Sequence, residues 1–507
     1  MIDRRQYFVL HAPRQSGKTT VVISAIQKLN QDDSYYALFC SLAQLRNMSD
    51  EKKAMRKLIS ILNGVLVDSN VDTLKNIYDD NFVATVTEKP NFQASPIQVW
   101  LNILSARLDK DLVVFFDEAD SLKERILLSF LTQLRDGYIA RSMRNPFPRS
   151  IALISMLNIR DYKAKIRPES ATLDSTSPFN IVAKALTLAD FSRNDIKNLY
   201  RQHTVETGQI FEDSAVERAW YWSEGQPWLV NALANQAVVD ILKCDYAASI
   251  TSEHIDQAAN NLMKIRDTHI DSLMARLHEP RVKRFIEPML SLSKSNTIKH
   301  KFKDSSELLS NDLQYCLDLG LIKSDNILRP ANPIYASVII RYLSSNYQIQ
   351  LIREISESAI RKWMDAESID MTGLLKEFQT FWASKSEKYL KGFNCLEAGP
   401  LILLSAFLRR VVNGGAIILE EYADGLGYID IDVKYTGQNY VIELKIKENQ
   451  RSQARSQEQI LRYMRGLSVK EGWLVIFDRK SDKSWTEKKI WKTVNTPKGE
   501  IIHIVGC

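Results

Sequence analysis

The chain has 507 residues, of which 25% are charged and 45% hydrophobic, and it carries a net charge of +6. This length exceeds what one hydrophobic core usually organises, so several domains are expected. The composition is that of an ordinary globular protein and excludes a disordered or fibrous chain. The mild positive charge is compatible with a nucleic-acid partner but does not establish one, because a whole-chain average hides local patches.

The cysteines and the apolar runs indicate the compartment. Five cysteines are scattered through the chain without a Cys-x-x-Cys pair, which predicts reduced thiols and argues against a zinc site. Residues 1–5 are polar and do not resemble a signal peptide. The longest apolar runs, such as 401–404, are too short to span a bilayer. We therefore expect a soluble, cytoplasmic protein without a membrane partner.

A phosphate-binding loop is the clearest motif near the N-terminus. The apolar run 7–11 predicts a buried strand, and a helical pattern follows the loop. Between them lies the motif A-x-x-x-x-G-K-T, formed with the next threonine by Ala12, Pro13, Arg14, Gln15, Ser16, Gly17, Lys18, Thr19 and Thr20. In such a loop peptide N–H groups hold phosphate oxygens, Lys18 reaches the β- and γ-phosphates, and Thr19 binds Mg²⁺. Ala12 replaces the usual first glycine, a small change that still allows the turn.

A second acidic motif lies further along the chain. The apolar run 112–116 ends in Asp117 and Glu118, which is the Walker B arrangement. We expect Asp117 to support the magnesium shell and Glu118 to orient or deprotonate the attacking water. A strand expected at 35–40 indicates the ATPase branch that has an additional strand between the Walker motifs. A helix cap is the alternative for the acidic pair, and the phosphate loop upstream argues against it.

Residues that would complete an ATPase site are marked less clearly. Asn158 and Arg160 follow a strand expected at 150–156, and a polar residue there is a candidate γ-phosphate sensor, with a plain loop role equally compatible. Arg135 and Arg141 are candidate arginine fingers in an oligomer. The sequence Asp-Glu-Ala-Asp that begins at the Walker B acid invites a helicase interpretation, which the absence of other helicase motifs argues against.

Four segments of the N-terminal half, 7–15, 159–163, 177–181 and 225–231, carry a family resemblance. They resemble bacterial AAA-like ATPases close to the STAND and archaeal ATPase groups. This resemblance implies a P-loop ATPase core at 1–190 and a helical lid at 191–275. Gly225-x-Pro227 is similar to the G-x-P motif of that class, whose proline packs near the adenine. A proline in the first turn of a helix is the structural alternative, and both interpretations can hold together.

The middle of the chain predicts a winged-helix domain and a helical connector. A helix at 310–321 and a short hairpin at 322–330 precede another helix, which suggests a winged helix at 276–345. Residues 346–390 are expected to form the connector. A basic cluster ahead of the first helix is compatible with phosphate contacts, although such a run is more often a solvated face. This cluster consists of Lys299, Lys301 and Lys303.

The C-terminal part, 391–507, has a distinct order of predicted elements. A helix at 400–412 precedes three strands, after which a helix at 452–467 and a strand at 473–477 follow. The three strands are expected at 416–422, 428–435 and 440–446. This order resembles that of a PD-(D/E)XK nuclease core. Because strand residues two apart share a face, Glu443 and Lys445 project together, as do Asp430 and Asp432.

The pairing of these strands decides which side chains meet. A hairpin around the turn 436–439, without a bulge, places Asp432 opposite Glu443 and Asp430 opposite Lys445. Acids on adjacent strands that share a face suit a hard divalent cation, Mg²⁺ or Mn²⁺. The cation would activate water, and Lys445 would assist the nucleophile or the developing charge. A surface salt-bridge cluster is the alternative, and alternation alone leaves both aspartates open as the ligand.

Resemblance to this nuclease class adds further residues. The G-x-G-x-x-D form selects Asp430 as the acid, with Tyr428 standing where relatives often carry arginine. Glu397 matches an additional acid found ahead of the first helix in many such nucleases. Gln459 and Tyr463 resemble the Q-x-x-x-Y motif of the RecB-type branch, whose residues help position metal ligands and DNA. A simple helical pair four residues apart is the alternative for these two.

Together the motifs predict a multidomain α/β protein that binds and hydrolyses ATP and cuts DNA at a C-terminal Mg²⁺ site. ATP would switch the lid and the winged helix and thereby gate cleavage, in genome defence or in repair. Expected partners are DNA, further copies of the chain through the ATPase part, and an activating protein. The competing hypothesis is a STAND-like signalling switch whose nuclease fold binds DNA or another molecule without cutting. A DNA-remodelling motor is disfavoured because helicase motifs are absent.

Overall fold

The computed structural model describes residues 1–156, 182–264, 273–289, 311–324, 328–351, 363–390, 399–412, 416–423, 428–446, 450–478 and 484–507. The chain divides into two compact units, which are described separately. The first is Met1–Asp190 with Asp318–Gly320, and the second is Phe191–Leu317 with Leu321–Cys507. No helix in the described ranges combines the length and the hydrophobicity needed to cross a bilayer.

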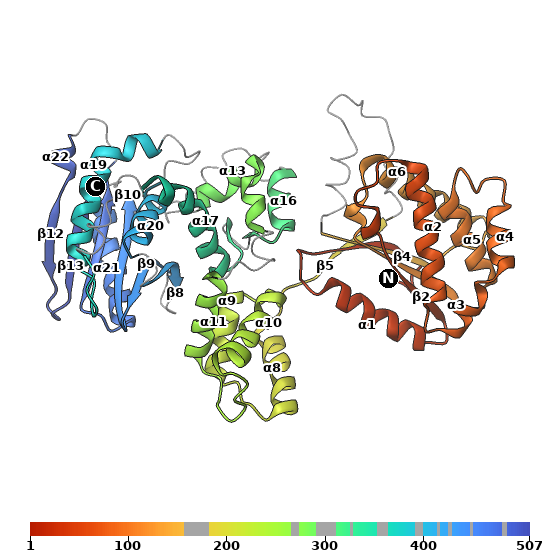
Figure 1. Cartoon of the computed structure of the whole chain (residues 1–507), viewed down its shortest axis with the longest axis horizontal. Helices are drawn as coiled ribbons and strands as arrows, with labels where there is room; N and C mark the ends of the chain where they lie inside the picture. The colour runs from red at the N-terminus through yellow and green to blue at the C-terminus, as the bar shows by residue number, and fades with distance from the viewer. Residues whose placement is uncertain are drawn as a thin grey trace. The chain divides into compact units, whose positions relative to one another are not determined.

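A parallel five-stranded sheet of order β2-β3-β4-β1-β5 forms the centre of the first unit (Figure 1). Its strands are β1 (Tyr7–His11), β2 (Tyr35–Ser41), β3 (Asp111–Asp117), β4 (Ser150–Ser155) and β5 (Val182–Thr187). Mostly apolar runs form β1 to β4, because both faces of a parallel sheet are buried, whereas the edge strand β5 carries the exposed Lys184. The strand between the two Walker strands, β1 and β3, is β4. The strand expected at 35–40, which lies between the two motifs along the chain, is β2 at the edge of the sheet.

Helices cover both faces of this sheet. On one face α1 (Lys18–Gln31) packs over a core that includes Ala37 and Phe115. On the other face the larger core holds the buried rings of Trp100 and Phe130. The helices there are α2 (Glu51–Val67), α3 (Asp72–Ile77), α4 (Asp80–Thr87), α5 (Pro96–Arg107) and α6 (Glu124–Ser142), with the short turns η1 (Ala43–Leu45) and η2 (Ala119–Ser121) beside β2 and β3.

The second unit begins with a helical region. Its members are α8 (Arg193–Thr207), α9 (Asp213–Ser223), α10 (Pro227–Asn235), the π-helical turn η4 (Gln236–Ile241) and α11 (Ser252–Lys264). The first of these helices starts at a capping box, in which the Ser192 hydroxyl and the Asp195 carboxylate accept bonds from each other's peptide N–H groups. This reciprocal capping is a local signal that fixes where the helix begins.

A small antiparallel hairpin stands among the helices that follow. The elements are η5 (Ala275–His278), α13 (Pro280–Met289), α16 (Asn311–Asp318), β6 (Ile322–Ser324), β7 (Leu328–Pro330) and α17 (Pro333–Leu351). The Arg329 guanidinium on β7 bonds both carboxylate oxygens of Glu224, at 2.6 and 2.8 Å. This bidentate pair ties the hairpin to the end of α9. The basic cluster at 299–303 lies outside the described residues.

A six-stranded mixed sheet of order β12-β13-β11-β10-β9-β8 ends the second unit (Figure 1). The order of helix, three strands, helix and strand matches the expected one. The elements are α20 (Gly399–Val412), β8 (Ile417–Ala423), β9 (Tyr428–Tyr435), β10 (Gln438–Ile446), α21 (Gln450–Gly466), β11 (Glu471–Phe477), α22 (Trp485–Lys488), β12 (Trp491–Asn495) and β13 (Ile501–Gly506). Strands β10, β11 and β13 are parallel to one another, and the remaining pairs are antiparallel.

The expected connector does not stay separate from this sheet. Its second half forms α19 (Met371–Leu390), where Phe378 packs on Phe407 with ring centroids 5.2 Å apart. The Gln379 amide donates to the Gly506 carbonyl at 2.6 Å. These contacts make α19 part of the C-terminal fold, and we therefore propose a domain boundary ahead of this helix instead of after residue 390.

Candidate functional site

The phosphate loop leaves β1 and turns into α1. Gln15 and Gly17 both adopt positive φ, at 55° and 81°, and this conformation is easiest for glycine. The Ser16 hydroxyl donates to the Pro13 carbonyl at 2.8 Å and closes the turn. The structure thus shows the strand, loop and helix that the motif requires. The first peptide N–H groups of α1 have no partner within the helix, as at every helix start, and can receive an anion.

Lys18 lies inside this loop. Its ammonium group donates to the carbonyl oxygens of Ala12 and Pro13, both at 2.7 Å. Burial lowers the pKa of Lys18 to about 8, and the nearby carboxylates of Asp120 and Asp117 oppose this shift. A lysine whose charge is desolvated in this way gains from any anion that approaches it.

Thr19 and Asp117 meet although 98 residues separate them in the chain. The Thr19 hydroxyl donates to Asp117 Oδ2 at 2.9 Å. The other oxygen, Oδ1, accepts the peptide N–H of Glu118 at 2.8 Å. Asp117 is buried at the end of β3. A hydroxyl and a carboxylate side by side are oxygen donors of the kind that Mg²⁺ prefers.

Glu118 has a partner that the sequence did not suggest. Its backbone is left-handed, with φ of 55°, and its carboxylate pairs with the Arg46 guanidinium at 2.7 Å. The side chains of Arg46 and Glu118 are 54% and 42% exposed. Because the two residues are 72 positions apart, no local pattern could have revealed the pair. The carboxylate is thus already engaged beside the site where it is expected to act.

Other candidates for the ATPase site differ in where they lie. Arg141 donates to the carbonyl oxygens of Arg5, Pro148 and Arg149 and lies 4.7 Å from the ring centroid of Tyr138. It therefore holds the fold together and is not free to reach a neighbouring molecule. Arg135 remains a candidate finger. Asn158 and Arg160 lie outside the described residues.

The Gly225-x-Pro227 segment belongs to the second unit. Gly225 has φ of 82°, and a Cβ built there would lie 2.0 Å from the Phe191 carbonyl oxygen, so only glycine fits. The Phe191 peptide N–H donates to the Gly225 carbonyl at 2.8 Å. Pro227 is buried in the first turn of α10, and Gln226 caps that helix. The structural alternative for the proline is therefore observed, and a contact with adenine stays a prediction.

The hairpin of β9 and β10 has a different register from the expected one. A two-residue turn, Thr436-Gly437, joins the strands with positive φ at both residues, 45° and 80°. Val441 therefore stands opposite Asp432, and the paired residues run up to Ile442 opposite Ile431. The expected pairing of Asp432 with Glu443 was wrong by two residues, because the turn was placed too far along the chain. Two positive φ angles make a tight hairpin turn that matches the strand twist.

With this register, Asp430 is the acid beside Glu443. The Asp430 carboxylate accepts the peptide N–H of Leu444 at 2.8 Å, where the ladder between the strands ends. Glu443 is completely buried, and its carboxylate lies 2.7 Å from the ammonium group of Lys445. Asp432, two residues beyond Asp430 on β9, is as completely buried as Glu443. The arrangement brings Asp430, Glu443 and Lys445 to neighbouring positions on two strands.

The remaining nuclease candidates are placed in part. On α21 the Gln459 amide donates to the Tyr463 hydroxyl at 2.9 Å, and Tyr463 is buried. Glu397 lies outside the described residues. Within the described part of the chain, no group of three or more histidine, cysteine, aspartate or glutamate side chains could hold a metal ion. A metal site that used Asp430 and Glu443 would therefore need further donors.

Comparison with known proteins concerns the fold alone. No protein-family model and no curated protein matches the chain. A Walker-type ATPase of Pyrococcus abyssi is similar over 66% of this chain and 91% of its own length, at 15% identity and a TM-score of 0.43. The RuvB Holliday junction branch migration motor of Thermotoga maritima is similar over 64% of this chain and 84% of its own length, at 14% identity and a TM-score of 0.32. Cdc6p of Pyrobaculum aerophilum is similar over 67% of this chain and 89% of its own length, at 11% identity and a TM-score of 0.34. Function is therefore argued below from the residues of this chain.

Proposed function

We propose that the first unit binds and hydrolyses ATP. The observation that supports this proposal is the 2.9 Å hydrogen bond from the Thr19 hydroxyl to Asp117 beside the phosphate loop. These two oxygens would hold Mg²⁺, which would neutralise part of the phosphate charge. Lys18 leaves the loop carbonyls and pairs with the phosphates. Glu118 orients the attacking water once its carboxylate turns away from Arg46.

We propose further that the second unit cuts DNA with Asp430, Glu443 and Lys445. The two carboxylates supply hard oxygen donors for Mg²⁺ or Mn²⁺, which would activate water and stabilise charge on the phosphodiester. The pair at 2.7 Å holds the positive charge of the Lys445 ammonium group next to Glu443. That charge is positioned to stabilise the oxyanion that develops during cleavage. Gln459 and Tyr463 are proposed to support this site from α21, and Glu397 to supply a further oxygen.

ATP is proposed to gate the nuclease through the lid and the winged helix. Arg329 on the small hairpin bonds Glu224, the residue directly before Gly225-x-Pro227. A movement of that segment on nucleotide binding would therefore be passed to the hairpin. Oligomerisation through the ATPase unit and an activating protein partner belong to the same proposal.

A second candidate function is a signalling switch whose nuclease fold binds DNA or another molecule without cutting. The observation in its favour is that no group of three metal-ligating side chains is found among the described residues. A metal held by two carboxylates and solvent alone would bind weakly, and catalysis would suffer accordingly. The burial of Asp430 and Glu443 side by side favours the nuclease, because a metal ion would offset the desolvation of two carboxylates, beside which Lys445 supplies one positive charge.

The test measures ATP hydrolysis and DNA cleavage in parallel. Supercoiled plasmid and single-stranded DNA are incubated with Mg²⁺ or Mn²⁺, with and without ATP. Lys445→Ala is expected to abolish cleavage and to leave ATP hydrolysis intact, whereas Lys18→Ala abolishes hydrolysis and alters cleavage. The matched controls are Lys492→Ala in β12 and Lys28→Ala in α1, each of which removes an exposed lysine. ATP hydrolysis by the wild type without cleavage of any substrate would favour the switch.

A further inference from the structure

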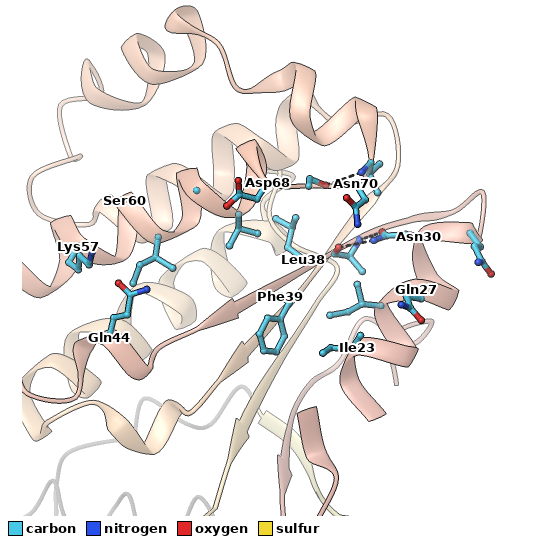
Figure 2. Close-up of a pocket in the computed structure, with 18 residues that line it drawn as sticks. Ile23, Gln27, Asn30, Leu38, Phe39, Gln44, Lys57, Ser60, Asp68 and Asn70 are labelled. Atoms are coloured by element: carbon cyan, nitrogen blue, oxygen red, sulfur yellow. Dashed lines mark hydrogen bonds between the residues drawn. The ribbon is translucent and has the colours of Figure 1, made fainter. Parts of the chain in front are cut away.

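The outer edge of β2 faces a groove instead of another strand. β2 is the end strand of its sheet, with α1 on one face and α2 on the other. Between the two helices lies a hollow of about 890 Å³ whose floor is Ala37, Leu38 and Phe39 (Figure 2). This volume is in the range of ordinary ligand sites. The groove is far in sequence from the Walker B acids, and none of the functions proposed above uses it.

One rung of the exposed edge is closed by a side chain. The Asn30 amide donates to the Ala37 carbonyl at 3.1 Å and accepts the Ala37 peptide N–H at 2.7 Å. It thus copies the pairing that a neighbouring strand would make. Because peptide groups alternate in direction along a strand, the peptide group of Phe39 points to the same side as that of Ala37. In the described part of the chain no hydrogen bond from outside the sheet reaches Phe39.

The walls of the groove are apolar where they face this open rung. Ile23 and Ile26 line it from α1, and Ile61 and Val65 line it from α2. Gly64 lies between the last two, in the last turn of α2, where glycine costs up to about 1 kcal/mol relative to alanine. A Cβ built at Gly64 meets nothing within 4 Å. Packing within the unit therefore does not require glycine here, and the space belongs to the groove.

Opposite charges mark the two ends of the groove. Lys57 lies near Gln44, and Asp68 lies at the C-terminal end of α2, on the side of Asn70 (Figure 2). Neither charge has an ion-pair partner in the described residues. At 1.5 Å per helical residue these positions are roughly 16 Å apart, the reach of about five residues of extended chain.

We propose that this groove binds an extended segment of a partner protein as an added strand on β2. Open peptide groups at a sheet edge accept another strand, and pockets beside the edge select its side chains. The segment carries about three apolar residues that face the two walls alternately. An acidic residue lies at the Lys57 end, and a basic residue lies at the Asp68 end. This proposal does not rest on the ATPase or the nuclease activity.

The probe is an array of pentapeptides of the pattern acidic, three apolar, basic, and of the reversed order, so that the array samples both strand directions and identifies the one that the groove accepts. The best binder is labelled with fluorescein, and its affinity for the full chain is measured by anisotropy. Methylation of one of two adjacent peptide nitrogens is expected to weaken binding at least tenfold, and methylation of the other is expected to be tolerated. Equal tolerance at both nitrogens, or no binder of either order, overturns the proposal.

Variants of the protein locate the site. Gly64→Leu fills the groove and is expected to weaken binding at least tenfold, whereas Gly64→Ala strengthens α2 and controls for folding by its melting temperature. The double variant Lys57→Glu with Asp68→Lys is expected to lose affinity for the selected peptide. It is expected to bind instead the peptide in which the acidic and the basic residue are exchanged. Ile139→Ala on exposed α6 serves as the distant control. Unchanged affinity in Gly64→Leu, or loss in Ile139→Ala, contradicts the proposal.

Discussion

The two candidate sites hold their acids in different ways. Asp117 and Glu118 are neighbours in the chain at the end of one strand, and the Glu118 side chain is 42% exposed. Asp430 and Glu443 come from two strands, and they are 3% and 0% exposed. A contiguous motif keeps its geometry whatever the strand pairing is, whereas a motif spread over a hairpin depends on the register. The difference shows why one site could be drawn from the sequence and the other only in part.

The largest expected effect separates the two aspartates of β9. If the proposed nuclease is correct, Asp430→Asn lowers cleavage about 10²–10³-fold, because a charged group beside the reaction is lost. Asp432→Asn is expected to cleave close to wild type, since Val441 and not Glu443 stands opposite it. Initial rates of plasmid nicking in Mg²⁺ measure both. The reverse order of the two variants would show that the expected register, and not the observed one, governs the site.

A matched pair of glycines compares the loop with the hairpin. Gly17 and Gly437 have φ of 81° and 80°, and neither would bring a Cβ within 4 Å of another atom. Each change to alanine is therefore expected to cost about 1–2 kcal/mol of unfolding free energy from backbone strain alone. Thermal unfolding measures this cost for the two variants.

The functional consequences of the pair are expected to differ. Gly17→Ala disturbs the peptide groups that face phosphate and so also loses nucleotide binding, measured with a fluorescent ATP analogue. Gly437→Ala lowers stability and keeps nucleotide binding, because its turn lies in the other unit. Loss of nucleotide binding in both variants would contradict the assignment of the loop.

Nucleotide affinity is expected to fall as the pH rises. The pKa of Lys18 is lowered to about 8 in the protein without nucleotide, and bound phosphate raises it again. Above pH 8 nucleotide binding must therefore take up a proton, and the affinity drops by up to about tenfold per pH unit. Below pH 8 the lysine is charged with and without nucleotide, so the affinity no longer depends on pH. The dissociation constant from pH 6.5 to 9.5 measures this. In Lys18→Arg the charge persists, and a slope that remained there would point to another group.

The smallest expected effect concerns Arg46. Exposed ion pairs contribute only about 0.2–1 kcal/mol, so the Arg46–Glu118 pair is a weak restraint on the catalytic carboxylate. Arg46→Ala is expected to raise steady-state ATP hydrolysis by roughly two- to fivefold, corresponding to that energy. Arg56→Ala, which removes an exposed arginine from α2, is the control. A fall in hydrolysis in Arg46→Ala would mean that the arginine takes part in the reaction.

The sequence by itself determined the local parts of this protein. Hydrophobic runs and turn residues predicted the phosphate loop between β1 and α1, the acids at the end of β3, and the order of elements around the C-terminal sheet. Each of these signals is short and contiguous, so neighbouring residues alone define it. Alternation also predicted correctly that Glu443 and Lys445 share a face.

Tertiary structure decided what joins distant segments. It placed β4 between the Walker strands, paired Glu118 with Arg46, and packed α19 on the C-terminal fold. It also set the register that brings Asp430 next to Glu443, through a turn of two positive φ angles at Thr436 and Gly437. A shift of two residues preserves the inward and outward pattern of a strand, so the pattern cannot report it. Only the backbone conformation of the turn and the packing of the whole sheet select one register.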